Sequence, residues 1–265
     1  MDALLALGSL RELALLVALS TTRVAVAFLL LPVFAPETVP ATVRNAIFLS
    51  LGVVTLALQP RLALPQWSTQ QWIGVFGKEA LLGIGFGVLL GALLWAFETA
   101  GQIVDAKVGA TMAQVVDPLS GHQTSLSGAL LSRLATFLFM AGGGFMLFVG
   151  SLQQSFAVWP IASTGLAIAP DGVAVFEAAF SRFAMLSLLL AAPALLVLYV
   201  VDLALGLINR FAPQVNLISI SMSLKSVAAM LVWLLLFGVL VDTTTERIGD
   251  TVRALLPQMQ RVVPR

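Results

Sequence analysis

The stretch ETAGQIVDAKVGATMAQVVDPLSGHQTSLSG, residues 98–128, is the part of the chain that most restricts its fold and function. In a chain that is 59% hydrophobic and only 10% charged, it holds five ionisable residues between two of the longest apolar runs: Glu98, Asp105, Lys107, Asp117 and His122. Polar groups placed there must face water, one another or a partner, because burying them without a hydrogen-bond partner is costly.

The composition is typical of an integral membrane protein. Mean hydropathy is +1.01, and several charge-free runs are long enough to cross a hydrocarbon layer of roughly 30 Å. A net charge of +1 with dispersed basic residues argues against a nucleic-acid partner, and the lack of cysteine excludes disulfides and thiolate metal sites. Residues 1–20 begin with an acidic residue, and their apolar stretch continues to Phe34. We therefore expect a retained membrane helix instead of a signal peptide.

The first apolar segments already depart from simple membrane spans. The run from Leu13 to Phe34 carries one charge, Arg23, near its middle, where a guanidinium costs at least about 2.5 kcal/mol and should face protein or a wet cavity. Prolines at 32, 36 and 40 then predict a turn region. The next charge-free run, Asn45 to Leu58, is short for a span and predicts a re-entrant or protein-buried helix.

The third apolar segment, residues 80–97, follows Lys78 and Glu79 and has glycine at every fourth position from Gly83. Such a stripe lets another backbone approach closely and predicts a packing face, although glycine is also common in membrane helices. Beyond Phe97 the helical spacing continues as a polar ridge made by Glu98, Gln102, Asp105 and Gly109. Asp117-Pro118 ends any helix there.

Later segments predict broken helices. Gly142-Gly143-Gly144 interrupts the run from Leu134 to Trp159 and indicates a kink or a hairpin apex. Pro193 lies at the centre of the run from Phe183 to Val201 and predicts a bend. Another apolar run covers residues 226–241, and residues 242–265 are expected to form an amphipathic tail whose four arginines favour a cytoplasmic C-terminus.

Catalysis has little support in the sequence. His122 is the only histidine and lacks carboxylates at metal-binding spacing, and neither a phosphate-binding glycine loop nor a GxSxG turn is present. We therefore expect no enzyme activity, metal or cofactor. Charges within the apolar segments suggest pairing, assembly contacts or a transport pathway. A secondary transporter would usually show two related halves, which the sequence lacks, but this class and a membrane anchor without a pore remain alternatives.

Four blocks resemble the export-gate subunit of type III secretion systems, called SctT in injectisomes and FliR in flagella. They are Arg23 with PVFAPETVP, AGQIVDAKVGATMAQVVDP with the following SG-x-Q, VDLALGLINRFAPQVN, and SMSLKS, in the family's order and across almost the whole chain. GGGFMLFVGSLQQSFAVWP and Ser223, where flagellar members often have proline, favour the injectisome branch.

The resemblance implies an all-α fold: a single membrane-embedded domain over residues 1–265, built of helical hairpins with kinked or broken helices that join a helical multi-subunit export gate. Implied partners are SctR-like and SctS-like membrane subunits, an SctU-like switch protein, an SctV-like export ring, the inner rod or needle, unfolded secreted proteins and membrane lipid. The implied location is the bacterial inner membrane, crossed several times. The expected function is non-enzymatic: forming and gating the channel for unfolded proteins.

Three groups of residues are expected to serve that function. The pore or gating loop comprises Gly109, Ala110, Thr111, Met112, Ala113, Gln114, Val115, Val116, Asp117 and Pro118; the alternative is a purely structural connection between helices. Residues expected in buried pairs or assembly contacts are Arg23, Glu79, Glu98, Gln102, Asp105, Asp202 and Lys225. Candidate subunit contacts are Gly83, Gly87, Gly91, Asn209, Arg210, Pro213, Gln214 and Asn216, of which the last five either contact another subunit or only cap a helix.

Overall fold

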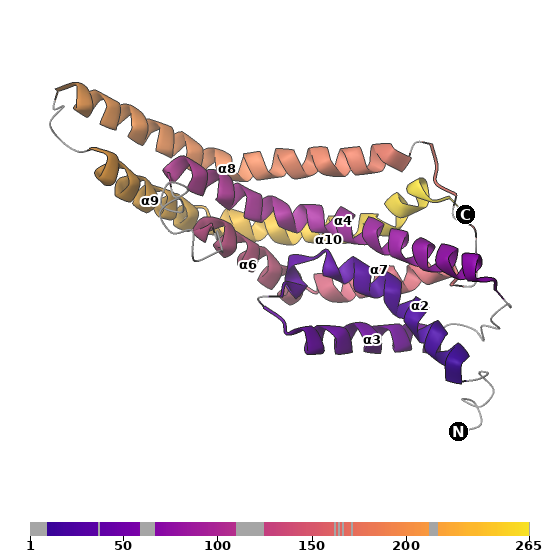
Figure 1. The fold of residues 1–265 in the computed structure, drawn as a ribbon. Coiled ribbons are helices and arrows are strands. Elements are labelled where there is room, and N and C mark those ends of the chain that lie inside the picture. Colours follow the sequence, from indigo (N-terminus) through magenta and orange to yellow (C-terminus); the bar gives the residue numbers. More distant parts are fainter. Residues whose placement is uncertain are drawn as a thin grey trace. The chain divides into compact units, whose positions relative to one another are not determined.

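The computed structural model describes residues 10–36, 38–58, 67–109, 125–161, 163, 165, 167–170, 172–211 and 217–264. Every regular element in these ranges is helical, which confirms the predicted all-α class (Figure 1). The elements are α2 (Leu10–Leu29), the 3-10 helix η1 (Pro32–Phe34), α3 (Ala41–Leu58), α4 (Thr69–Val108), α6 (Leu126–Ala141), α7 (Gly144–Val158), α8 (Gly172–Phe211), α9 (Leu217–Leu235) and α10 (Phe237–Val262).

The chain divides into two compact units. Unit 1 comprises Met1–Ala92, Gly143–Ala179 and Gly249–Arg265, and unit 2 comprises Leu93–Gly142 and Phe180–Ile248. Helices α4, α8 and α10 each contribute residues to both units.

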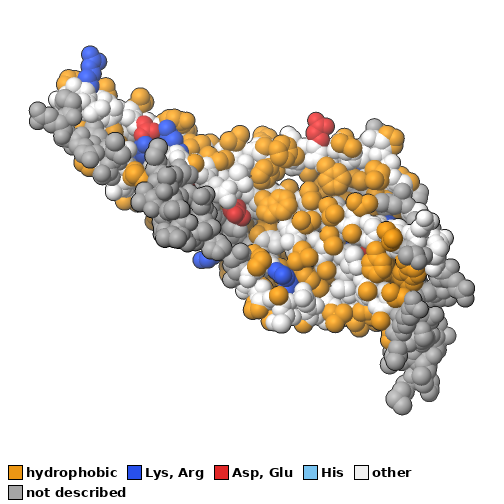
Figure 2. Space-filling model, in the orientation of Figure 1, with side chains coloured by type: hydrophobic (Ala, Val, Ile, Leu, Met, Phe, Trp, Pro, Cys, Tyr) orange, Lys and Arg blue, Asp and Glu red, His pale blue; other side chains and the backbone are white. Residues whose placement is uncertain are grey.

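Three of the described helices are long and apolar enough to cross a membrane: α3, α4 and α8. If the bent pairs α6–α7 and α9–α10 each count as one span, the number rises to five. Hydrophobic side chains cover much of the face in Figure 2. The expectation of a helix too short to span was wrong for α3, because it begins at Ala41 and takes in Arg44. Its apolar window is only 17% buried within the chain, so this chain alone does not bury the helix.

Helix ends follow local chemistry. At the start of α4, Ser68 N–H donates to Gln71 Oε1 at 2.8 Å and Gln71 N–H donates to Ser68 Oγ at 3.4 Å, a reciprocal capping box. Trp67 and Trp72 flank this box with ring centroids 4.9 Å apart, as a hydrophobic staple does. The predicted break at the triple glycine is confirmed, since α6 ends at Ala141 and α7 starts at Gly144.

Three positions compare the observed helices with the predicted breaks. Gly143 has φ 74°, a left-handed conformation that suits glycine and separates α6 from α7. Pro193 lies inside α8, which is assigned as one helix over 40 residues. The break at Leu236 between α9 and α10 was not predicted, because the apolar run 226–241 contains no proline.

Close backbone contacts build the core of unit 1. A side chain at Gly83 would lie 2.7 Å from the Arg23 carbonyl oxygen, and one at Gly87 would lie 2.8 Å from the Ala27 carbonyl oxygen. The glycine stripe therefore meets α2 of the same chain at these two positions. Gly91, the third member, is buried as well.

Aromatic rings fill the space beside this contact. The Phe28 ring lies within 6 Å of four other rings, at centroid distances of 5.2 Å to Phe34, 5.9 Å to Phe48, 5.6 Å to Phe145 and 5.1 Å to Phe148. These residues come from α2, η1, α3 and α7, so the cluster ties the first three elements to the helix after the triple glycine. Helix α2 also packs along α3.

Replacing Gly83 by alanine should destabilise unit 1. The added methyl group would overlap the α2 backbone at Arg23, and overpacking of this kind costs about 1 to 3 kcal/mol. The matched control is Gly77→Ala in the same helix, where an added Cβ meets nothing within 4 Å. Thermal unfolding of the purified protein in detergent should show a lower transition for Gly83→Ala only; equal transitions would contradict close packing at Gly83.

Candidate functional site

A fully buried carboxylate, Glu79 on α4, organises the polar interior of unit 1. Arg23 on α2 donates to both of its oxygens, at 2.7 Å from Nε and 3.0 Å from Nη2, which is a bidentate pair. Lys78 Nζ lies 3.1 Å from Glu79 Oε1, and both side chains of the Arg23–Glu79 pair are 0% exposed. One carboxylate therefore pairs with two cations.

The remaining donors of Arg23 bind α7 and the residue after it. Arg23 Nη1 donates to Ser155 Oγ at 2.8 Å, and Nη2 donates to the Trp159 carbonyl at 2.8 Å. The guanidinium carbon also lies 3.8 Å from the centre of the Phe156 ring, a cation–π contact. Arg23 thus links α2 to α4 and to the end of α7, and it meets protein as the sequence predicts for a charge at that depth.

Lys78 fixes the connection that follows α7. Its ammonium donates to three carbonyl oxygens, at 2.7 Å for Pro160, 3.3 Å for Ile161 and 2.8 Å for Ser163. These oxygens spread the surplus positive charge that Glu79 alone does not neutralise. The turn after Trp159 is held by a charge-assisted set of bonds instead of by a helix.

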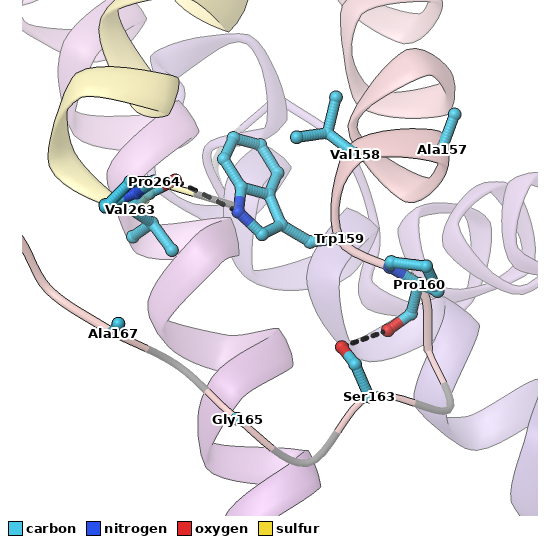
Figure 3. Close-up of a pocket in the computed structure, with 9 residues that line it drawn as sticks. All are labelled: Ala157, Val158, Trp159, Pro160, Ser163, Gly165, Ala167, Val263 and Pro264. Carbon is cyan, nitrogen blue, oxygen red and sulfur yellow. Dashed lines mark hydrogen bonds between the residues drawn. The ribbon is translucent and has the colours of Figure 1, made fainter.

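A cavity of about 660 Å³ lies beside this turn, between the end of α7 and the last residues after α10 (Figure 3). The indole of Trp159 points across it, and Nε1 donates to the Val263 carbonyl at 3.1 Å. Its walls are mainly apolar or small, including Val158, Gly165 and Pro264. None of the described residues that line the cavity is charged.

Unit 2 contains a second shared carboxylate, Asp202 on α8. Lys107 Nζ lies 2.8 Å from Asp202 Oδ2, and Lys225 on α9 pairs with Oδ1. Lys107 also sits 4.0 Å from the centre of the Tyr199 ring. The structure brings together Asp202 and Lys225, two of the residues expected in buried pairs or assembly contacts, and adds Lys107 to them. These side chains are 14% to 29% exposed, unlike Glu79.

The polar ridge of α4 faces the start of α6. Asp105 Oδ2 accepts from Ser125 Oγ at 2.6 Å and from Ser127 N–H at 2.8 Å. Ser132 Oγ donates to Glu98 Oε2 at 3.3 Å, and Gln102 donates to Glu98 Oε1 at 3.2 Å. Three members of the predicted ridge therefore bond within the chain.

The other predicted residues fall at helix ends or outside the described ranges. Gly109 ends α4 with φ 95°, which favours glycine. Asn209 and Arg210 lie exposed in the last turn of α8. The described residues do not include Ala110–Pro118, His122, Pro213, Gln214 or Asn216.

Sequence reasoning missed the roles of Lys78, Lys107 and Ser155. Each lies inside or beside an apolar run and could have been found by asking which polar group offsets a buried charge. The described part of the chain contains no cluster of three or more His, Cys, Asp or Glu side chains that could hold a metal ion.

Residues 14–251 match the family model described as bacterial export proteins, family 1. The chain is 31% identical over 241 residues to Yop proteins translocation protein T of Yersinia pestis, covering 88% of this chain and 91% of that protein. It is 32% identical over 235 residues to surface presentation of antigens protein SpaR of Salmonella typhimurium, covering 88% and 86%. It is 26% identical over 241 residues to flagellar biosynthetic protein FliR of Bacillus subtilis, covering 88% and 92%.

The chain belongs to the SctT/FliR family. The chain has a higher identity to Yop proteins translocation protein T and to SpaR than to FliR. This places it in the injectisome branch, as the sequence predicts. As an SctT-type protein, it is a membrane component of a type III secretion export apparatus, which is a multi-subunit system.

Glu79→Gln should be among the single substitutions that most reduce the stability of this SctT-type chain. Among the described residues it removes the carboxylate that pairs with both Arg23 and Lys78, and breaking a buried pair costs roughly 3 to 5 kcal/mol. The control is Glu177→Gln, an exposed glutamate of α8 in the same unit. Membrane extraction should recover the control at normal yield and little Glu79→Gln. Normal yield and melting temperature for Glu79→Gln would refute the structural role.

Asp202→Asn should lower the melting temperature less than Glu79→Gln does but more than Lys107→Met does. Asparagine leaves two lysines without a carboxylate, whereas loss of Lys107 leaves the Asp202–Lys225 pair intact. Partial exposure of all three side chains lowers the cost. Melting temperatures of the three variants give the order, and a lower value for Lys107→Met than for Asp202→Asn would overturn it.

Proposed function

We propose that this SctT-type protein is a non-enzymatic, pore-forming subunit that helps form and gate the channel for unfolded secreted proteins. The observation that carries the proposal is the export-family match over residues 14–251, which covers the polar stretch 98–128. The interior of the chain supports it further, because the buried ionisable groups described above are bonded to one another and to carbonyls. They build a scaffold instead of a substrate-binding centre.

The gate itself is assigned to residues 109–118, GATMAQVVDP. Small and flexible apolar side chains, Met112 among them, can close against an unfolded chain without selecting one sequence. An apolar constriction can also block ions by dewetting. The position of Gly109 at the end of α4, with its left-handed φ of 95°, supports a change of chain direction at the start of this segment.

Partners are proposed from exposed apolar surface. The most apolar windows of α3 and α8 are only 17% and 28% buried within the chain, whereas that of α4 is 72% buried. Lipid or other membrane subunits must cover α3 and α8. We assign part of this surface to SctR-like and SctS-like subunits in the inner membrane. The assembled gate contacts the SctU-like protein, the SctV-like ring, the inner rod or needle, and the unfolded substrates.

Co-purification tests the proposed assembly and separates it from a secondary transporter or a simple anchor. A subunit of the gate should be extracted with two smaller membrane proteins and should be poorly behaved when produced alone. Extraction of a stable, monodisperse chain without those two proteins would favour the other classes.

Deletion of Ala110 to Val115 should open the closed gate. In an assembled complex, loss of the apolar segment should raise ion conductance of the resting membrane, because the constriction that excludes water is gone. Conductance and secretion are measured together, with complex assembly checked by co-purification. Unchanged conductance in a fully assembled complex would show that the segment is only a connection between helices.

A further inference from the structure

The seam between α4 and α6 in unit 2 is closed by a carboxylate from one helix that caps the other. Asp105, in the last turn of α4, accepts the backbone N–H of Ser127 at 2.8 Å and the hydroxyl of Ser125 at 2.6 Å. Ser125 is the N-cap of α6, and its oxygen accepts the Gly128 N–H at 2.9 Å. Asp105 thus satisfies one free amide of α6 directly and orients the hydroxyl that satisfies another.

The charge of Asp105 strengthens this arrangement. The first turn of a helix carries partial positive charge from its unpaired N–H groups, and an anion there is favourable. An ionised acceptor also makes hydrogen bonds about twice as strong as a neutral one. Here the anion comes from a residue 20 positions before the cap, so the cap also joins two helices.

Below this cap the two helix backbones touch. A Cβ at Gly101 would overlap the backbone of Ser127 and Gly128, and a Cβ at Gly128 would lie 3.1 Å from the Glu98 carbonyl oxygen. One turn further, Ser132 donates to Glu98 at 3.3 Å. The seam therefore has close backbone contact at its centre and side-chain hydrogen bonds at both ends.

We propose that Asp105 is a positioning residue that locks α4 and α6 into one rigid hairpin, and that this hairpin stays closed while the apparatus exports protein. The inference rests on the proposed function, since it states which described part of the subunit does not move during gating. Gly109, with φ 95°, lies one turn beyond Asp105, so α4 is held up to the residue at which its backbone leaves the helix.

The first test measures the cap directly and does not depend on gating. In assembled complex, the Ser127 and Gly128 amides should exchange with solvent deuterium about fivefold faster in Asp105→Ala, the factor expected from loss of one helix cap. Asp105→Asn keeps an acceptor and should restore most of the protection. The matched control is Asp250→Ala, an exposed carboxylate. Unchanged exchange in Asp105→Ala would refute the cap.

The second test asks whether the hairpin stays closed. The chain has no cysteine, so Asp105→Cys with Ser127→Cys supplies a unique pair for cross-linking in assembled complex. The oxidised complex should secrete at the wild-type rate and show wild-type ion leak. The reduced pair, which lacks both cap and cross-link, should leak several-fold more. Arrest of secretion on oxidation, with both single-cysteine variants still active, would show that the helices separate and would overturn the proposal.

The two proposals fail in different ways. If residues 110–115 are no gate, their deletion leaves conductance unchanged while exchange at Ser127 and Gly128 still depends on Asp105. If Asp105 is no clamp, exchange is unaltered in Asp105→Ala while the deletion still raises conductance.

Discussion

The bidentate bond between Arg23 and Glu79 is the interaction on which the rest of unit 1 depends. A guanidinium and a carboxylate that are both 0% exposed are stable only if every donor and acceptor is satisfied, and here the partners come from α2, α4, α7 and the turn after it. The Trp159 turn supplies one of these partners, and the close contact of Gly83 with the Arg23 backbone brings α2 and α4 together beside the pair. The Phe28 cluster then fills the adjacent space with apolar rings.

In both units one carboxylate pairs with two cations, but the remaining positive charge is offset differently in each unit. Around Glu79, three backbone carbonyls accept from Lys78, so the extra charge is dispersed inside the protein. Around Asp202, the extra charge is offset by the Tyr199 ring and by partial exposure. The first arrangement is complete within the chain, whereas the second borders surface that a partner or lipid headgroup can reach.

The sequence predicted what depends on composition and local pattern. Charge depletion indicated membrane helices, the triple glycine indicated a break, and Arg23 indicated a buried partner. It could not predict that Glu79 would be that partner, because the two residues are 56 positions apart. Likewise, spacing placed Asp105 on a polar ridge without showing that its hydrogen-bond donors lie at the start of α6. The break at Leu236 has no proline to mark it, whereas the start of α3 at Ala41 directly follows Pro40, the last proline of the predicted turn.

Buried charges that pair within the chain, together with incompletely covered apolar helices, suit a subunit of a larger assembly. Polar groups of α4 find partners within the chain, so they offer little to an incoming protein, while α3 and α8 keep broad apolar surface. Apolar surface can be covered by lipid or by neighbouring helices without adding new buried charges. The charges are paired within each unit and the uncovered surface is apolar, so assembly through apolar contact leaves the network that holds each unit together undisturbed.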